Sequence, residues 1–170
     1  INGVHLNVSD KDVIEIAGTS SNVIFTPGHT SGHICFYLND EKILFSGDTL
    51  FNLGCGRVFE GSMEQMQESL KKIINLPDET EVYCGHEYTL SNAKFCLSLQ
   101  PNNIEIKKKY DEIVKKRNNN QFTVPFKLGE QKLLNPFLQF DNKDFIKTMN
   151  LNEKTETEIF EYLRNKKDNF

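Results

Sequence analysis

Three strand-like segments of this chain each end in a glycine that is followed by a His or an Asp. The three pairs are Gly28-His29, Gly47-Asp48 and Gly85-His86. Loops at strand ends converge at one edge of a layered sheet, and a glycine allows the sharp turn that brings the next side chain inward. We therefore expect a sheet whose strand ends carry two imidazoles and one carboxylate.

These residue types indicate a metal site. Neutral imidazoles and a carboxylate are typical ligands of zinc or iron, and the two oxygens of Asp48 can bridge a pair of ions. A single His or Asp in a loop is more often structural than ligating, so the hypothesis depends on all three residues together. His33 is expected to have a supporting or structural role, and His5 stands in no motif and receives none.

Turn residues and periodicity divide the chain into a β-rich front and an all-helical back. Strands are predicted over 13–16, 22–26, 33–38, 42–46 and 81–84, with a Gly-rich loop over 47–61. Helices are predicted over 63–75, 90–99, 103–117, 128–133, 141–148 and 153–167. Ser62 and Gln65 form a capping-box pair at the start of the first helix.

The charge changes along the chain in the same place. Residues 1–95 hold 6 basic and 13 acidic side chains, whereas residues 96–170 hold 14 and 11. We therefore expect two units, 1–95 and 96–170. The formal net charge of −4 argues against a dedicated nucleic-acid-binding protein. No stretch approaches the roughly 20 apolar residues of a membrane-spanning helix.

The four cysteines, at positions 35, 55, 84 and 96, form no CxxC pair, which argues against a zinc ribbon. Reduced, buried thiols are the expected state, and they fit a reducing compartment. We expect a cytoplasmic protein. A mitochondrial or plastid form is left open because the chain starts at Ile1 and not at Met.

Long motifs around the three pairs carry a resemblance. They are TPGHTSGHICFYL at 26–38, FSGDTLFNLGCGRVFEG at 45–61 and VYCGHEYTLSNAKF at 82–95. Together they resemble the metallo-β-lactamase superfamily and, more narrowly, the glyoxalase II (hydroxyacylglutathione hydrolase) family. Residues 123–140 and 164–170 resemble that family's helical domain and tail. The resemblance implies an α/β fold, with the second half of an αββα sandwich at 1–95 followed by an all-helical glutathione-binding domain at 96–170.

The resemblance also implies a binuclear site. His29 would ligate the first divalent ion, His86 the second, and Asp48 would bridge them, with zinc, iron or manganese as the metal. A bridging hydroxide would attack the thioester of S-D-lactoylglutathione and release D-lactate and glutathione. No protein nucleophile is then needed, so Cys55 and Cys84 are expected to be structural.

Glutathione carries two carboxylates and one ammonium, so cationic side chains are expected to hold it. By resemblance these contacts are Arg57, Tyr88, Arg164 and Lys167, with Phe59 standing next to them where many relatives have Tyr. Without the resemblance, Arg164 and Lys167 are better interpreted as a solvated helix end.

One family signature, T-H-x-H-x-D-H, does not occur in these 170 residues. It would supply three His and one Asp, and two ions need about four to six protein ligands. We therefore expect a fragment that lacks the N-terminal half of the catalytic domain, binds metal weakly and is inactive alone. Its sheet should have an apolar face, covered by that half or by a second copy in a homodimer.

Three other functions remain open. A glutathione persulfide dioxygenase with one iron would share His29 and Asp48, although the GHEYT motif and the Arg164/Lys167 tail favour the hydrolase. A non-catalytic glutathione-binding fragment is suggested by the missing ligands. A nuclease of the same superfamily is disfavoured by the net charge and by the lack of a basic stripe with aromatic residues.

Overall fold

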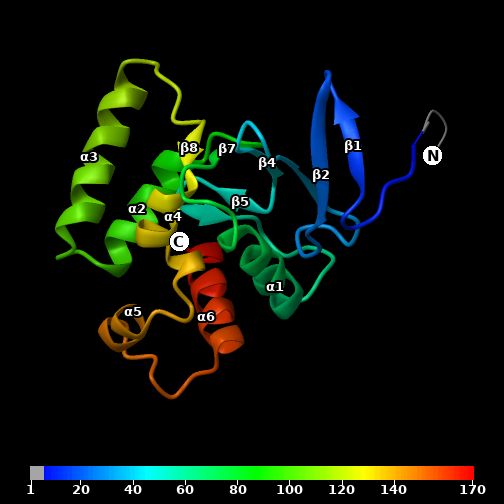
Figure 1. Ribbon diagram of the computed structural model, residues 1–170. Coiled ribbons are helices and arrows are strands. Elements are labelled where there is room, and N and C mark those ends of the chain that lie inside the picture. Colours follow the sequence, from blue (N-terminus) through cyan, green and yellow to red (C-terminus); the bar gives the residue numbers. More distant parts are fainter. Residues whose placement is uncertain (1–5) are drawn as a thin grey trace.

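The computed structural model describes residues 6–170, so His5 lies outside the described residues. Within them, one sheet has the strand order β1-β2-β3-β4-β7-β8 (Figure 1). Its strands are β1 (Val13–Ile16), β2 (Thr19–Phe25), β3 (Ile34–Leu38), β4 (Ile43–Gly47), β7 (Glu81–Cys84) and β8 (Phe126–Lys127). The short strands β5 (Leu50–Phe51) and β6 (Gly54–Cys55) form a separate hairpin.

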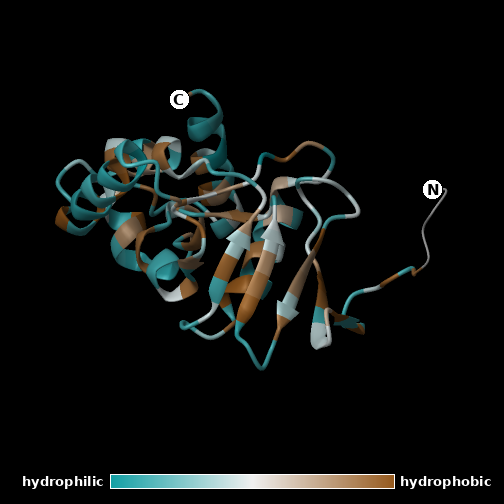
Figure 2. Ribbon diagram, turned by 90° about the horizontal axis from the view of Figure 1, so that it is seen from above, coloured by the Kyte–Doolittle hydropathy of each residue, from teal (hydrophilic) through white to brown (hydrophobic). Residues whose placement is uncertain are grey.

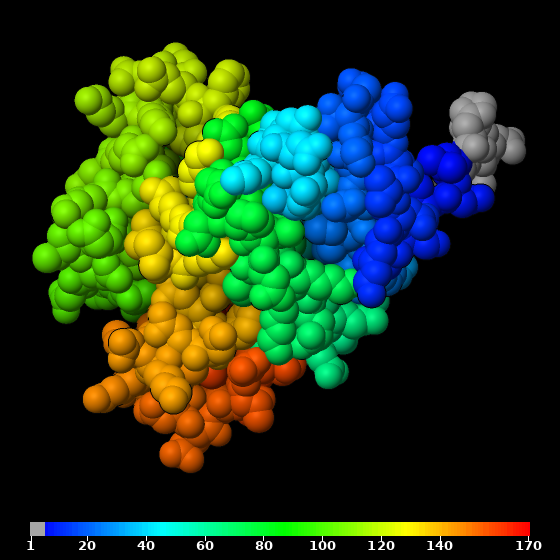
Figure 3. Space-filling view, viewed as in Figure 1, coloured from blue at the N-terminus to red at the C-terminus, as the bar shows by residue number. Residues whose placement is uncertain are grey.

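The helices are α1 (Met63–Ile74), α2 (Thr89–Leu99), α3 (Ile104–Asn118), α4 (Leu128–Leu134), α5 (Lys143–Thr148) and α6 (Glu156–Asp168), with a 3₁₀ turn η1 (Pro136–Leu138). In the space-filling view the strands β1–β4, in blue and cyan, form one side of the molecule. The later helices, from green to red, form the other (Figure 3).

Strand direction determines where the functional loops meet. Strands β2 and β3 run antiparallel, as do β3 and β4, whereas β4 and β7 run parallel because α1 crosses over between them. Strands β2, β4 and β7 therefore point the same way. Their carboxyl ends lie at one edge of the sheet, and His29, Asp48 and His86 follow those ends.

One face of the sheet is closed by α1. Cys35, Leu44 and Val82 are fully buried there, in one apolar cluster with Met66 and Leu70 of α1. Alternation in a strand sends the intervening residues to the opposite face. Hydrophobic residues, in brown, run along several strands of the sheet in Figure 2.

The opposite face is apolar but only partly covered. Its paired residues Phe36, Phe45 and Tyr83 come from three adjacent strands. Phe45 keeps 41% of its surface exposed, and Phe36 and Tyr83 are half-buried. The partly exposed apolar face expected from the sequence is therefore present. What covers it stays a prediction.

Aromatic side chains pack the helical elements against one another. Phe95 of α2, Phe137 of η1 and Phe160 of α6 are buried. The ring centroid of Phe137 lies 6.1 Å from that of Phe95 and 6.0 Å from that of Phe160. Helices α2 and α3 share a second, smaller core with Leu53 from the β5–β6 connection. This packing places the end of α6 beside the loops at the sheet edge.

Most predicted elements lie within three residues of their predicted limits, and two parts of the prediction are wrong. The Gly-rich segment 47–61 is not loop throughout, because it contains the β5–β6 hairpin. The back part is not helical throughout, because Phe126–Lys127 pairs with β7. The unit boundary expected at residue 95 falls inside α2 and stays a prediction. No helix in residues 6–170 is long and apolar enough to cross a bilayer.

The capping box at the start of α1 gives a direct stability test. The Ser62 hydroxyl accepts from the Gln65 backbone N–H at 3.1 Å, and the Gln65 side chain accepts from the Ser62 N–H at 2.9 Å. Ser62→Ala is expected to lower the free energy of unfolding by about 1 kcal/mol. Ser62→Asp, which keeps an acceptor at this position, should lose much less of this free energy. Urea unfolding measures both variants against the wild type. Equal losses in both variants would contradict this account of the cap.

Candidate metal centre

The structure brings His29, Asp48 and His86 together from three separate loops. Asp48 Oδ2 lies 3.4 Å from His29 Nε2, and Asp48 Oδ1 lies 3.5 Å from His86 Nε2. Ligands bonded at 2.0–2.1 Å to a tetrahedral ion lie about 3.3 Å apart, so both separations suit a shared cation. Each carboxylate oxygen thus faces a different imidazole, as a bridging ligand requires.

Two observations indicate that cations fit here. Asp48 Oδ1 is buried and makes no hydrogen bond within the described residues. His29 Nδ1 lies 2.9 Å from the Arg57 carbonyl oxygen, which can only accept, so Nδ1 donates and the Nε2 lone pair is the one that a metal would use. That lone pair faces Asp48 Oδ2, another acceptor, and a cation between the two atoms would remove the conflict. Within residues 6–170, however, no three His, Cys, Asp or Glu side chains gather into a complete ligand set.

The glycines before these residues are needed for two different reasons. Gly47 has a φ of 49°, and a Cβ there would stand 2.7 Å from His33 Nε2. Gly85 is needed for close approach, because a Cβ there would stand 2.6 Å from Asp48 Oδ1. The expected sharp turn is thus found at Gly47, while at Gly85 the space belongs to the carboxylate.

His33 holds the backbone of Asp48 in place. Its Nε2 accepts from the Asp48 backbone N–H at 3.1 Å, and its Nδ1 lies 2.8 Å from the Thr26 hydroxyl and 3.0 Å from that of Thr49. Burial, and then the neighbouring His29, lower the pKa of His33, which favours the neutral ring that can accept at Nε2. The supporting role expected from the sequence agrees with these contacts.

Two glutamates that the sequence analysis did not single out hold the loops in place. Glu60 accepts from the Ser31 N–H at 2.8 Å and so ties the His29 loop to the segment before α1. Glu87 accepts from the Thr123 N–H at 3.0 Å and from its hydroxyl. Burial raises the pKa of Glu87, but these hydrogen bonds outweigh it and leave the pKa below its ordinary value. Both contacts join segments far apart in sequence, so no local pattern predicts them.

The metal-capable residues open into a cavity of about 550 Å³, named here the site cavity. All of the site residues expected from the sequence line it: His29, Asp48, Arg57, Phe59, His86, Tyr88, Arg164 and Lys167. Tyr88 stacks on His86 with centroids 5.0 Å apart, and Phe59 lies 5.0 Å from the His29 ring. Aromatic side chains thus flank both imidazoles on the cavity side.

The two basic residues expected near the tail, Arg164 and Lys167, differ in burial and in their hydrogen bonds. Only 4% of the Arg164 side chain is exposed, and its guanidinium donates to the Cys55 carbonyl at 2.8 Å and to Asp168 at 2.9 Å. The Lys167 ammonium donates to Ser91 Oγ at 3.0 Å, and burial lowers its pKa. Arg164 therefore supports the cavity wall from within, and Lys167 keeps an ammonium near its surface.

The cysteines near the cavity are poor nucleophiles in this structure. Cys55 is buried beneath Arg164, and burial raises the pKa of its thiol to about 11. Burial also raises the pKa of Cys84. All four cysteines are free thiols. Because the thiolate is the reactive form, these sulfurs are expected to stay protonated and structural.

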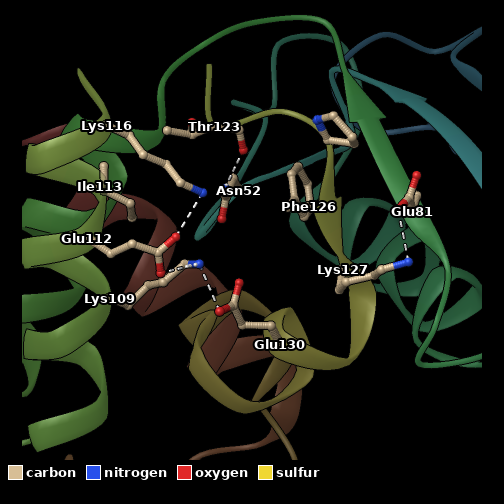
Figure 4. A pocket seen from close by; sticks show the side chains of 11 residues that line it. Asn52, Glu81, Lys109, Glu112, Ile113, Lys116, Thr123, Phe126, Lys127 and Glu130 are labelled. Atoms are coloured by element: carbon tan, nitrogen blue, oxygen red, sulfur yellow. Dashed lines mark hydrogen bonds and ion pairs between the residues drawn. The ribbon is translucent and has the colours of Figure 1, made fainter. Parts of the chain in front are cut away.

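A second cavity, of about 480 Å³, lies between α3 and the β7–β8–α4 region (Figure 4). Its charged residues are already paired among themselves: Lys109 with Glu112 and Glu130, Lys116 with Glu112, and Lys127 with Glu81. None of the expected site residues lines it. The Lys109–Glu130 ion pair connects α3 to α4 across this cavity. Among the described residues, no unpaired charge in it is left for a ligand.

Comparisons with known proteins find two family models that together cover almost the whole chain. Residues 2–86 match the family model of the metallo-beta-lactamase superfamily, and residues 87–170 match that of the hydroxyacylglutathione hydrolase C-terminus. The hydroxyacylglutathione hydrolase of Bartonella henselae is 50% identical over 85% of this chain and 57% of that protein. That of Microcystis aeruginosa is 46% identical over 100% of this chain and 67% of that protein.

Solved structures show the same fold. The BLEG-1 B3 metallo-beta-lactamase has a TM-score of 0.53 and 26% identity, over 79% of this chain and 48% of its own. ETHE1 from Myxococcus xanthus has a TM-score of 0.57 and 23% identity, over 99% of this chain and 63% of its own. The fold class expected from the sequence is confirmed. The chain spans 57% to 67% of the length of the two curated relatives described above.

Proposed function

Because the chain belongs to the hydroxyacylglutathione hydrolase family of the metallo-β-lactamase superfamily, we propose that its gene product hydrolyses S-2-hydroxyacylglutathione thioesters. S-D-lactoylglutathione would yield D-lactate and glutathione. The observation that carries the proposal is the Asp48 carboxylate, whose two oxygens face the imidazoles of His29 and His86. Two divalent cations bound there would polarise the thioester carbonyl and lower the pKa of water.

This chain's own residues position the reaction. The Arg57 carbonyl orients the His29 ring, the His33 ring fixes the Asp48 backbone, and Tyr88 packs against His86. We propose that His29 and His86 each hold one ion and that Asp48 holds both. Three donors are few for two ions, so we propose that further donors come from outside the described residues. The 170-residue chain alone is then expected to bind metal weakly and to be inactive.

The cavity wall supports a glutathione conjugate as the substrate. Arg57 is 61% exposed at its side chain, and the Lys167 ammonium is half-buried beside it, so both can meet carboxylates. Tyr88 is 51% exposed and offers a hydroxyl. Phe59 is 66% exposed and offers only apolar surface next to His29.

A single-iron dioxygenase acting on glutathione persulfide is the nearest alternative. The geometry favours two ions over one, because each Asp48 oxygen lies near a different imidazole. A metal analysis of the purified gene product separates the two functions. Two divalent ions per chain support the hydrolase, whereas one iron and oxygen consumption support the alternative. A cytoplasmic location also stays a prediction.

Removal of metal tests the function directly. The gene product is expected to release thiol from S-D-lactoylglutathione, to lose this activity after dialysis against a chelator, and to regain it with zinc, manganese or iron. A chelated sample with an unchanged rate would contradict the proposal. So would a metal-loaded sample that leaves the thioester intact.

A further inference from the structure

We propose that Asp168 binds the free ammonium group of the substrate's γ-glutamyl end, so that the enzyme selects thioesters with an unmodified amine. The inference rests on the proposed function and deepens it. Asp168 ends α6 and lines the site cavity, and its side chain is 32% exposed. Asp168 stands in none of the motifs around the three Gly pairs, although its i,i+4 spacing from Arg164 predicts contact on one helix face.

The carboxylate of Asp168 is held from one side only. Its Oδ1 accepts from Arg164 at 2.9 Å and lies 3.4 Å from Arg57 Nε. Both of these contacts are made by Oδ1, and no hydrogen bond to Oδ2 is found within residues 6–170. Arg164 is almost fully buried and also donates a hydrogen bond to the Cys55 carbonyl, so it holds the Asp168 carboxylate in a fixed position. One oxygen is thereby left for a ligand in the cavity.

The charges of the cavity match those of the glutathione part of the thioester. That part has two carboxylates and one ammonium. The cavity presents the cations Arg57 and Lys167 for the carboxylates, and its acidic lining residues among those described are Asp48 and Asp168. Asp48 faces the two imidazoles, so Asp168 is the acidic side chain that remains for the ammonium.

The contact between Arg57 and Asp168 does not prevent this role. Arg57 is 61% exposed and its Nε lies 3.4 Å from Asp168, so the pair is weak and largely solvated. A substrate carboxylate can take Arg57 while its neighbouring ammonium, on the same γ-glutamyl carbon, takes Asp168. The two ligand charges would then replace an exposed ion pair with two charge-assisted hydrogen bonds.

The test compares two thioesters in the complete gene product: S-D-lactoylglutathione and its N-acetyl derivative, which lacks the ammonium. The wild-type protein is expected to show a KM about 10–100-fold lower for the free amine, as a hydrogen bond between charged groups predicts. Asp168→Asn should lose that preference, and Asp168→Glu should keep part of it. Asp141→Asn, at an exposed turn, is the matched control and should keep it fully.

The outcomes separate this inference from the function. If Asp168→Asn raises KM equally for both thioesters, Asp168 only orients Arg57 and the inference is wrong. A wild-type protein that hydrolyses both thioesters with equal KM contradicts the inference and leaves the function standing. A wild-type protein that hydrolyses neither contradicts both.

Discussion

Asp48→Asn is expected to lower thioester turnover by the complete gene product by more than about 100-fold and to reduce its bound metal. Residues that only support a ligand change metal affinity or activity by about 10–100-fold, so a bridging ligand should exceed that range. An amide can present one oxygen to one ion, but its NH₂ group would then face the other. The observed geometry requires an acceptor on both sides of the group.

The matched control is Asp40→Asn, because Asp40 lies exposed in the turn between β3 and β4. It should keep full turnover and metal content. Metal per chain is measured by elemental analysis, and turnover by thiol release. Two tightly bound ions together with near-normal turnover in Asp48→Asn would show that Asp48 does not bridge.

Phe137→Ala is expected to lower the free energy of unfolding by about 3–5 kcal/mol. The ring is fully buried, lies against Phe95 and Phe160, and has the Arg164 guanidinium 5.0 Å above it. Its removal leaves a cavity where η1, α2 and α6 meet. Because Arg164 holds Asp168, the variant should also disturb the wall of the site cavity.

Phe122→Ala removes the same ring from a position that is 79% exposed, and it should change stability by no more than about 0.5 kcal/mol. Both variants are compared with the wild type in urea unfolding of the complete gene product. Equal, small losses in the two variants would show that the helical part does not depend on this aromatic cluster.

Local patterns were enough to predict most elements and the three site residues. Strand β1 has the predicted limits, and α1 begins after the predicted capping box, because alternation and capping act between residues close in sequence. The Gly47-Asp48 turn is local in the same sense, since a positive φ favours glycine. The missed strand β8 is only two residues long, and it exists because β7 offers it a partner 44 or more residues away.

The amino-acid sequence by itself determined the order of elements, the types of side chain available to a metal, and the loops that carry them. The tertiary structure alone decided that β2, β4 and β7 point the same way, which brings His29, Asp48 and His86 to one edge. It also decided that Arg164 is buried and that Asp168 lines the site cavity. The physical reason is that these properties depend on contacts between segments up to about a hundred residues apart, such as the Arg164 contact with the Cys55 carbonyl.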